Sequence, residues 1–253
     1  MKISLTGKGG VGKTTLTALL TLAYLKEGKK VLAVDADPDG NLGQALGVPR
    51  YENITPVVEM KELIQERTGA RPGEVGSYFK LNPKVDDIPD RYAWSKDNLK
   101  FLVMGIIKKA GGGCACPENV FLKSLIDHLI LERDEIVLMD MPAGLEHLGR
   151  ATAQAVDMML IVVEPGQKSI DSARRILNLA RGLGLKRLGL VANKLRGEED
   201  KKFILEKFKF YDILGFIPFS PEILKADREN KAGVSFGKVV DDEIKKIMDN
   251  IRR

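Results

Sequence analysis

The sequence predicts an α/β fold with a doubly wound, mainly parallel sheet of about seven strands and helices on both faces. Three observations support this prediction. A glycine-rich loop joins an apolar run to a helical segment near the start, strand-like apolar runs alternate with amphipathic segments, and several runs end in acidic or amide residues. The alternation implies right-handed crossovers between parallel neighbours.

The first unit is a strand, a loop and a helix. An apolar run at residues 3–5 leads into GKGGVGKTT at residues 7–15, and helical spacing over residues 13–26 ends before Gly28. In this context G-x-x-x-x-G-K-[ST] is a phosphate-loop signature. Glycines let backbone N–H groups turn toward an anion, and the positive end of the helix dipole attracts the same anion. The sequence therefore predicts a P-loop NTPase fold.

Each residue of this loop has an expected role in binding ATP or ADP. Lys13 is expected to reach the outer phosphates, and the Thr14 hydroxyl is expected to ligate Mg²⁺. The other nucleotide contacts are expected from Gly9, Gly10, Val11, Gly12 and Thr15.

Six further strands complete the expected sheet, at residues 30–34, 98–105, 135–139, 158–163, 187–192 and 213–217. The helices between them are expected at residues 118–131, 169–182, 198–208 and 237–251. Residues 51–97 are expected to form a loop-rich excursion, with a helix before residue 67 and weak local structure after it. No domain boundary is visible, so residues 1–253 are expected to form a single domain.

Composition and charge narrow the class of protein. The 253 residues are 44% hydrophobic and 30% charged, which is ordinary for a soluble globular protein. The net charge is +5, but the basic residues are scattered among 35 acidic ones, so nucleic acid is not an expected partner. No signal peptide and no apolar run long enough to span a membrane is visible, and a cytoplasmic location is expected.

Carboxylates follow two of the expected strands. Asp140 is expected to hold Mg²⁺, usually through water, and Gly144 to let a backbone N–H approach the terminal phosphate. Asp35 and Asp37 follow the second strand at the same edge of the sheet, where Mg²⁺ needs carboxylates nearby. Asp39 is expected only to form the turn.

An amide side chain follows a third strand and suits the nucleotide base. Asn193 stands at the end of the strand expected at residues 187–192. Its side chain can pair a donor and an acceptor with the adenine edge. Asn193 is therefore expected to contact the base.

The two cysteines, Cys114 and Cys116, lie in a stretch rich in Gly and Pro. In an extended segment residues i and i+2 point the same way, so both thiolates can reach one metal ion. One chain supplies two ligands, and a two-fold dimer would supply four on its axis. A buried inert pair and a local redox pair remain open as alternatives.

The string GKGGVGKTT resembles the deviant phosphate loop of the MinD/ParA/nitrogenase-iron-protein class of ATPases. The resemblance implies that Lys8 crosses a dimer interface to the partner's nucleotide, so the ATP-bound enzyme is a homodimer. It also implies that Asp37 orients the attacking water while Asp35 assists near Mg²⁺. Pro218 would belong to a second base-contacting loop beside Asn193.

Four blocks narrow the resemblance to the CooC-type accessory ATPases, which serve nickel insertion into carbon monoxide dehydrogenase. These blocks are the phosphate loop and residues 35–41, 113–119 and 140–149, and the C-x-C pair before Pro-Glu-Asn is the most discriminating. The resemblance implies an ATP-hydrolysing metallochaperone. Its nucleotide-dependent dimerisation would build a Ni²⁺ or Zn²⁺ site from Cys114 and Cys116 of both chains, with carbon monoxide dehydrogenase as the client.

Two other functions remain open. An iron–sulfur reductase like the nitrogenase iron protein would hold a cluster on the same axis, although proteins of that group take their cysteines from well-separated positions. A ParA/MinD-type positioning ATPase would need DNA contacts or a membrane-binding tail. Residues 241–253 mix acidic residues into their helix and lack aromatics, which favours a packing helix over a membrane anchor.

Overall fold

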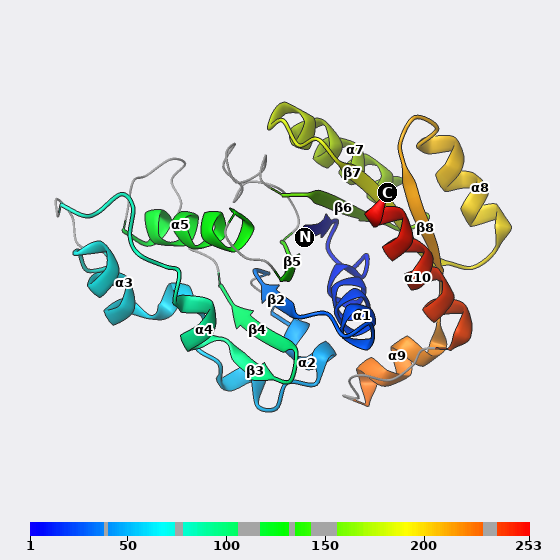
Figure 1. Ribbon diagram of the computed structural model, residues 1–253. Coiled ribbons are helices and arrows are strands. Elements are labelled where there is room, and N and C mark those ends of the chain that lie inside the picture. Colours follow the sequence, from blue (N-terminus) through cyan, green and yellow to red (C-terminus); the bar gives the residue numbers. More distant parts are fainter. Residues whose placement is uncertain (38–39, 74–77, 106–116, 132–134, 143–155, 230–236) are drawn as a thin grey trace.

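The computed structural model describes residues 1–37, 40–73, 78–105, 117–131, 135–142, 156–229 and 237–253 (Figure 1). These residues contain one eight-stranded sheet with the order β3-β4-β2-β5-β1-β6-β7-β8. Every neighbouring pair is parallel except β3–β4, which is antiparallel and lies at one edge. The predicted doubly wound α/β fold is confirmed, with one strand more than expected.

The seven parallel strands correspond to the seven that the sequence predicts. They are β1 (Lys2–Gly7), β2 (Val31–Asp35), β4 (Leu99–Val103), β5 (Ile136–Asp140), β6 (Met158–Val163), β7 (Leu188–Leu195) and β8 (Ile213–Pro218). All residues of β1, β2 and β6 are buried. Continuous burial explains the unbroken apolar character of β6, because helices cover both faces of a parallel sheet.

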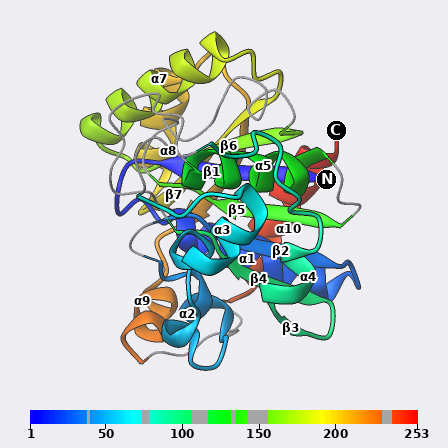
Figure 2. The same cartoon turned by 90° about the vertical axis from the view of Figure 1, so that its left-hand side faces the viewer.

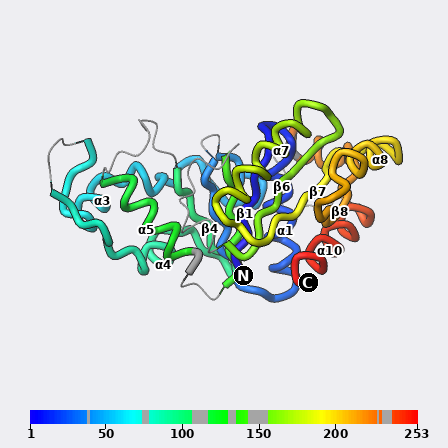
Figure 3. The backbone as a smooth tube through the Cα atoms, turned by 90° about the horizontal axis from the view of Figure 1, so that it is seen from above, coloured from blue at the N-terminus to red at the C-terminus, as the bar shows by residue number. Residues whose placement is uncertain are grey.

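Helices occupy both faces of this sheet (Figure 1). They are α1 (Lys13–Lys26), α2 (Leu42–Leu46), α3 (Lys61–Thr68), α4 (Ile88–Tyr92), α5 (Pro117–Leu131), α7 (Gln167–Gly182), α8 (Glu198–Lys207), α9 (Pro221–Arg228) and α10 (Lys238–Arg252). Two 3₁₀ turns, η1 (Tyr51–Asn53) and η2 (Val57–Glu59), precede α3. Seen from above, α3 and α5 lie toward one end of the molecule, and α8 and α10 toward the other (Figure 3).

The core has two main parts, one on each face of the sheet. On one face, α1 and α10 bury Leu20 and Ile247 against β1, β6 and β8. On the other face, α5 and α7 bury Phe121 and Ile170 against the alternate side chains of the same sheet. The sheet is therefore held from both sides, and its carboxyl edge provides a rigid base for the loops that follow the strands.

Residues 51–97 hold more regular structure than the sequence predicts. β3 (Trp94–Lys96) pairs with β4, and α4 buries Ile88 in the core. Arg67 reaches Asp87 at 2.7 Å and ties α3 to the start of α4. The sequence did not predict β3 and α4, because both are short and polar and are stabilised by contacts with β4 and the core. The short helices α2 and α9 were likewise not predicted.

No helix within the described ranges is both long enough and apolar enough to cross a membrane.

Close packing of α10 on β8 generates a stability prediction. A Cβ built on Gly215 would lie 2.4 Å from Ile247 Cγ1, and Ile247 is fully buried. Gly215→Ala should therefore lower the free energy of unfolding by about 1–3 kcal/mol, the usual cost of overpacking. Urea denaturation followed by circular dichroism measures this change.

The matched control is Gly182→Ala at the end of α7, where a built Cβ meets no described atom within 4 Å. This variant should be neutral or slightly stabilising, since alanine is the better helix former. Equal loss of stability in both variants would contradict the packing argument.

Candidate nucleotide site

The glycine-rich loop connects β1 to α1 at the carboxyl edge of the sheet. Gly10 and Gly12 have φ angles of 80° and 94°, which side chains with a Cβ rarely adopt. Gly12 is the N-cap of α1, and among the described residues it has no side-chain cap and no acidic residue in the first turn after it. The first N–H groups of α1 and its positive dipole end are therefore open to an anion.

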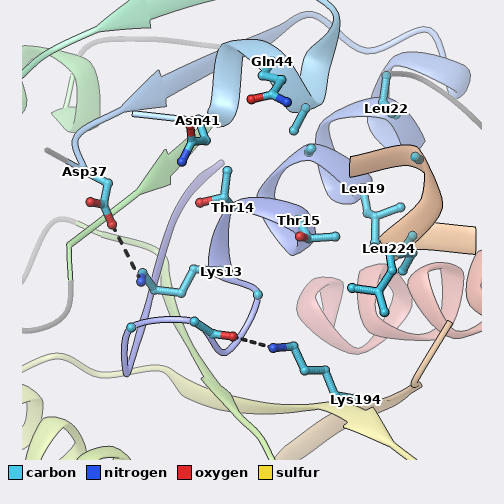
Figure 4. Close-up of a pocket in the computed structure, with 17 residues that line it drawn as sticks. Lys13, Thr14, Thr15, Leu19, Leu22, Asp37, Asn41, Gln44, Lys194 and Leu224 are labelled. Carbon is cyan, nitrogen blue, oxygen red and sulfur yellow. Dashed lines mark hydrogen bonds and ion pairs between the residues drawn. The ribbon is translucent and has the colours of Figure 1, made fainter. Parts of the chain in front are cut away.

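A cavity of about 470 Å³ opens over this loop (Figure 4). Asp37 and Asn41, from the segment after β2, stand on one side of the loop, and Lys194 from β7 stands on the other. Leu19 of α1 and Leu224 of α9 add an apolar wall. Figure 2 shows α2 and α9 close together beside α1, so this cavity is bordered by three helices.

Lys13 and Asp37 meet in this cavity. Lys13 Nζ lies 3.7 Å from Asp37 Oδ2, and only 7% of the lysine side chain is exposed (Figure 4). The distance is longer than a good charge-assisted hydrogen bond. A phosphate group in the cavity can therefore replace Asp37 as the partner of the ammonium.

Thr14 and Asp140 form a second pair beside the loop. The Thr14 hydroxyl donates to Asp140 Oδ2 at 2.6 Å. Asp140 is fully buried, and its Oδ1 has no hydrogen-bond partner among the described residues. A buried carboxylate oxygen without a partner, next to a hydroxyl, suits a hard cation that takes oxygen ligands. The residues present therefore fit Mg²⁺, which Thr14 and Asp140 would hold directly or through water.

Asp35 lies beside Asp140, since the two residues are partners in the β2–β5 ladder. Its oxygens accept hydrogen bonds from the backbone N–H groups of Asp37 at 3.2 Å and Leu42 at 3.1 Å. Burial raises the pKa of Asp35 to about 6, against the effect of these two hydrogen bonds. Asp35 thus positions the segment that carries Asp37.

Burial also raises the pKa of Asp140 to about 7, although the Thr14 hydrogen bond opposes the shift. The negative charge of Asp35 raises it further, and Lys13 lowers it. Two neighbouring carboxyls with raised pKa values are typical of a site that binds a cation.

The two residues expected at the base lie at the ends of β7 and β8. The Asn193 amide donates to the Val11 carbonyl at 2.8 Å, and its Oδ1 accepts the Lys194 N–H at 2.9 Å. Asn193 and Pro218 both line a smaller cavity of about 50 Å³, next to Leu19. Contact of Asn193 and Pro218 with adenine stays a prediction.

Lys8 is half-exposed above the loop. Its Nζ lies 3.7 Å from Glu164 Oε1, at the end of β6, with 38% of the lysine side chain exposed. Lys194 Nζ lies 3.6 Å from the other oxygen of the same carboxylate. Sequence reasoning assigned no role to Glu164 or Lys194. Their positions directly at the end of apolar strands were the available signal, as for Asp140.

Three predicted site residues lie outside the described residues. These are Cys114, Cys116 and Gly144. Within the described part of the chain, no group of three or more His, Cys, Asp or Glu residues is arranged to hold a metal ion. Pro117 starts α5 as the sequence predicts, directly after the cysteine segment.

The sheet is doubly wound, and its carboxyl edge carries a glycine-rich loop, a buried lysine and a Thr–Asp pair. Together these features define a P-loop nucleotide-binding protein. Residues 3–234 match the model of the CobQ/CobB/MinD/ParA nucleotide binding domain. The chain belongs to this family, and it is an ATPase that uses ATP and ADP.

Several relatives are similar over most of their length. The carbon monoxide dehydrogenase accessory protein CooC of Rhodospirillum rubrum is 47% identical, over 93% of this chain and 89% of that protein. An uncharacterized ATP-binding protein of Methanocaldococcus jannaschii is also 47% identical, over 90% of this chain and 88% of its own. Among solved structures, the MinC:MinD cell division complex of Aquifex aeolicus has a TM-score of 0.67 and 26% identity, over 99% and 93% of the two chains.

The buried Asp140 carboxyl generates a pH prediction. Its folded-state pKa lies above the unfolded value, so the folded chain binds more protons and loses stability as pH rises from about 4 to 7. Asp140→Asn removes a cost of up to ~4 kcal/mol at pH 8 in the nucleotide-free protein. The melting temperature of the variant should therefore exceed that of the parent at pH 8 and approach it near pH 4.

Differential scanning fluorimetry without Mg²⁺ or nucleotide checks this outcome. The exposed Asp86→Asn variant serves as the control and should show no such pH-dependent gain. If Asp140→Asn melted below the parent at both pH values, the proposed desolvation of a buried carboxylate would be wrong.

Proposed function

We propose that this ATPase is a metallochaperone, in which ATP-dependent dimerisation captures a Ni²⁺ or Zn²⁺ ion for delivery to an enzyme of the carbon monoxide dehydrogenase type. The observation that carries the proposal is the 47% identity to the CooC accessory protein over 93% of the chain. The Cys114–Cys116 pair supports it, because thiolates are ligands for such ions.

The nucleotide chemistry follows from the pairs at the loop. The γ-phosphate replaces Asp37 as the partner of the Lys13 ammonium. The Asp37 carboxylate then orients a water molecule for attack on phosphorus. The P–O bond to ADP breaks as the bond to water forms, and phosphate leaves with the added oxygen. When bound by Thr14 and Asp140, Mg²⁺ neutralises phosphate charge.

Dimerisation supplies the second half of the site. Lys8 is half-exposed at the loop, and Glu164 is its nearby counter-ion. In the ATP-bound dimer Lys8 turns from Glu164 to the partner's phosphates. This exchange makes the closed dimer depend on the nucleotide. Lys8 gives up its ion pair with Glu164, and only the partner's phosphates offer a new interaction in its place.

Metal capture is coupled to that closure. Two thiolates from each chain complete a four-ligand site on the two-fold axis. Structural Zn²⁺ sites are worth about 10–16 kcal/mol, so dividing the ligands between chains links metal affinity strongly to dimerisation. Hydrolysis loosens the dimer and returns each chain to a weak two-thiolate half-site.

The central prediction concerns metal stoichiometry. With a non-hydrolysable ATP analogue, gel filtration should give a dimer that retains about one Ni²⁺ or Zn²⁺ per two chains. The Cys114→Ala/Cys116→Ala double variant should still dimerise with the analogue but retain no metal, as measured by elemental analysis of the eluted peak.

Lys8→Ala is the matched control on the nucleotide side. It should bind ADP normally, fail to dimerise with the analogue and retain no metal. Tight, stoichiometric metal on nucleotide-free monomers would refute the proposal, and a broad visible absorption band under anaerobic conditions would favour an iron–sulfur cluster instead.

A kinetic prediction tests Asp37. Asp37→Asn should lower kcat for ATP hydrolysis by roughly 10²–10⁴, as expected for a group that positions the reacting water. Its affinity for ADP should change far less, since ADP lacks the γ-phosphate. Phosphate release and calorimetric ADP titration measure the two quantities.

The exposed Asp249→Asn variant on α10 is the control, with unchanged kcat expected. An Asp37→Asn enzyme with parental turnover would remove Asp37 from the mechanism.

A positioning ATPase is the second candidate, and the likeness to the MinC:MinD cell division complex favours it. ATP-dependent retention on lipid vesicles or on DNA, lost at high salt in the case of DNA, would support it over metal delivery.

A further inference from the structure

Two adjacent residues at the end of β7 hold two consecutive carbonyl groups of the phosphate loop. Lys194 Nζ donates to the Gly10 carbonyl at 2.5 Å, and the Asn193 amide donates to the Val11 carbonyl at 2.8 Å (Figure 4 shows the first of these). We propose that Asn193 and Lys194 form a clamp that positions the phosphate loop for the nucleotide before it binds.

The planar peptide bond carries the argument from these carbonyls to the phosphates. In a trans peptide unit, the C=O of one residue and the N–H of the next point in opposite directions. Holding the carbonyls of Gly10 and Val11 toward β7 therefore directs the N–H groups of Val11 and Gly12 away from β7. The N–H of Val11 makes only a long contact, 3.4 Å, with the Lys8 carbonyl, so a bound phosphate can readily take its place.

A glycine-rich loop needs this support. Gly10 and Gly12 tolerate many backbone conformations, so an unrestrained loop would lose that freedom only when the nucleotide binds. A clamp that restricts the loop in advance reduces the entropy lost on binding. The affinity for phosphates then depends on residues that are more than 180 positions away in the chain.

The clamp is itself held in an unusual conformation. Lys194 has a φ angle of 61°, in the left-handed region, and its backbone N–H donates to Asn193 Oδ1 at 2.9 Å. The ladder between β7 and β8 is irregular between Ala192 and Leu195. Strained residues of this kind are kept where the surrounding structure uses them. Lys194 adopts this conformation while its ammonium donates to the Gly10 carbonyl.

The loop is built to receive the clamp. A Cβ built on Gly12 would lie 2.3 Å from Asn193 Nδ2, so the side chain of any other residue would push the amide away. Glu164 lies 3.6 Å from Lys194 and helps to orient its ammonium. The pair is partly exposed, so it orients Lys194 more than it stabilises the fold.

This clamp leaves the expected adenine contact possible. The Asn193 amide has a second N–H, and its oxygen has a second lone pair, beyond the two hydrogen bonds described. Asn193 is therefore a positioning residue for the loop whether or not it also contacts the base.

The test compares Lys194→Met with the parent protein, using ADP and Mg²⁺ on monomers that contain no Ni²⁺ or Zn²⁺. Removing the ammonium while keeping the stem should weaken ADP binding about tenfold, or ~1.4 kcal/mol, in calorimetric titration. The melting temperature of the nucleotide-free protein should stay near the parental value. In ¹H–¹⁵N spectra without nucleotide, the amide signals of Val11 and Gly12 should shift.

Two further variants keep the result interpretable. Lys194→Arg retains a donor for the Gly10 carbonyl and should recover most of the affinity, whereas Lys202→Met, an exposed lysine on α8, should behave as the parent. Parental ADP affinity in Lys194→Met would overturn the clamp. Weakened binding with unmoved amide signals would also overturn it, because Lys194 would then act only by direct contact with the nucleotide. Neither result depends on metal or dimerisation, so failure of metal delivery would leave this test intact.

Discussion

The open first turn of α1 is the constraint on which the rest of the site depends. Gly12 caps the helix without a side chain, and the first turn contains no acidic residue, so the first N–H groups and the helix dipole face the cavity without a side-chain cap. Buried Lys13 adds a full positive charge at the same place. Such a concentration of donors is costly unless an anion completes it, and nucleotide phosphates have the matching charge and acceptors.

The remaining charges form temporary pairs around that turn. Lys13 faces Asp37 at 3.7 Å, and Glu164 lies near Lys8 and Lys194 at similar distances. These distances are long for charge-assisted hydrogen bonds. Each ion pair therefore neutralises the charges of its two side chains but binds them only weakly to each other. Nucleotide binding can exchange partners one by one at small cost. An ATPase that works as a switch needs pairs of this kind, because a site with strong internal ion pairs would resist its ligand.

The family of this chain and its proposed metal cargo are inferred from different parts of the molecule. The described sheet edge accounts for nucleotide binding, and relatives of the same family include cell division and accessory proteins. The proposed metal delivery rests on Cys114 and Cys116, which lie outside the described residues and have no counterpart in the chemistry of phosphate binding. In the proposed function, short segments attached to a nucleotide-binding fold would give it a specific task. The proposed Asn193–Lys194 clamp concerns nucleotide binding and not the metal.

Local pattern alone determined the seven parallel strands, the span of α1 and the order of motifs along the chain. Strand burial, helical periodicity and glycine turns act over a few residues, so the sequence displays them directly. Only the tertiary structure placed Asp140 against Thr14, 126 positions away, and Asn193 and Lys194 against the loop, 182 and 184 positions away. It also added the short polar strand β3 to the sheet edge. These contacts follow from β1 lying between β5 and β6, with β7 next to β6, and periodicity along a chain carries no information about which strands become neighbours.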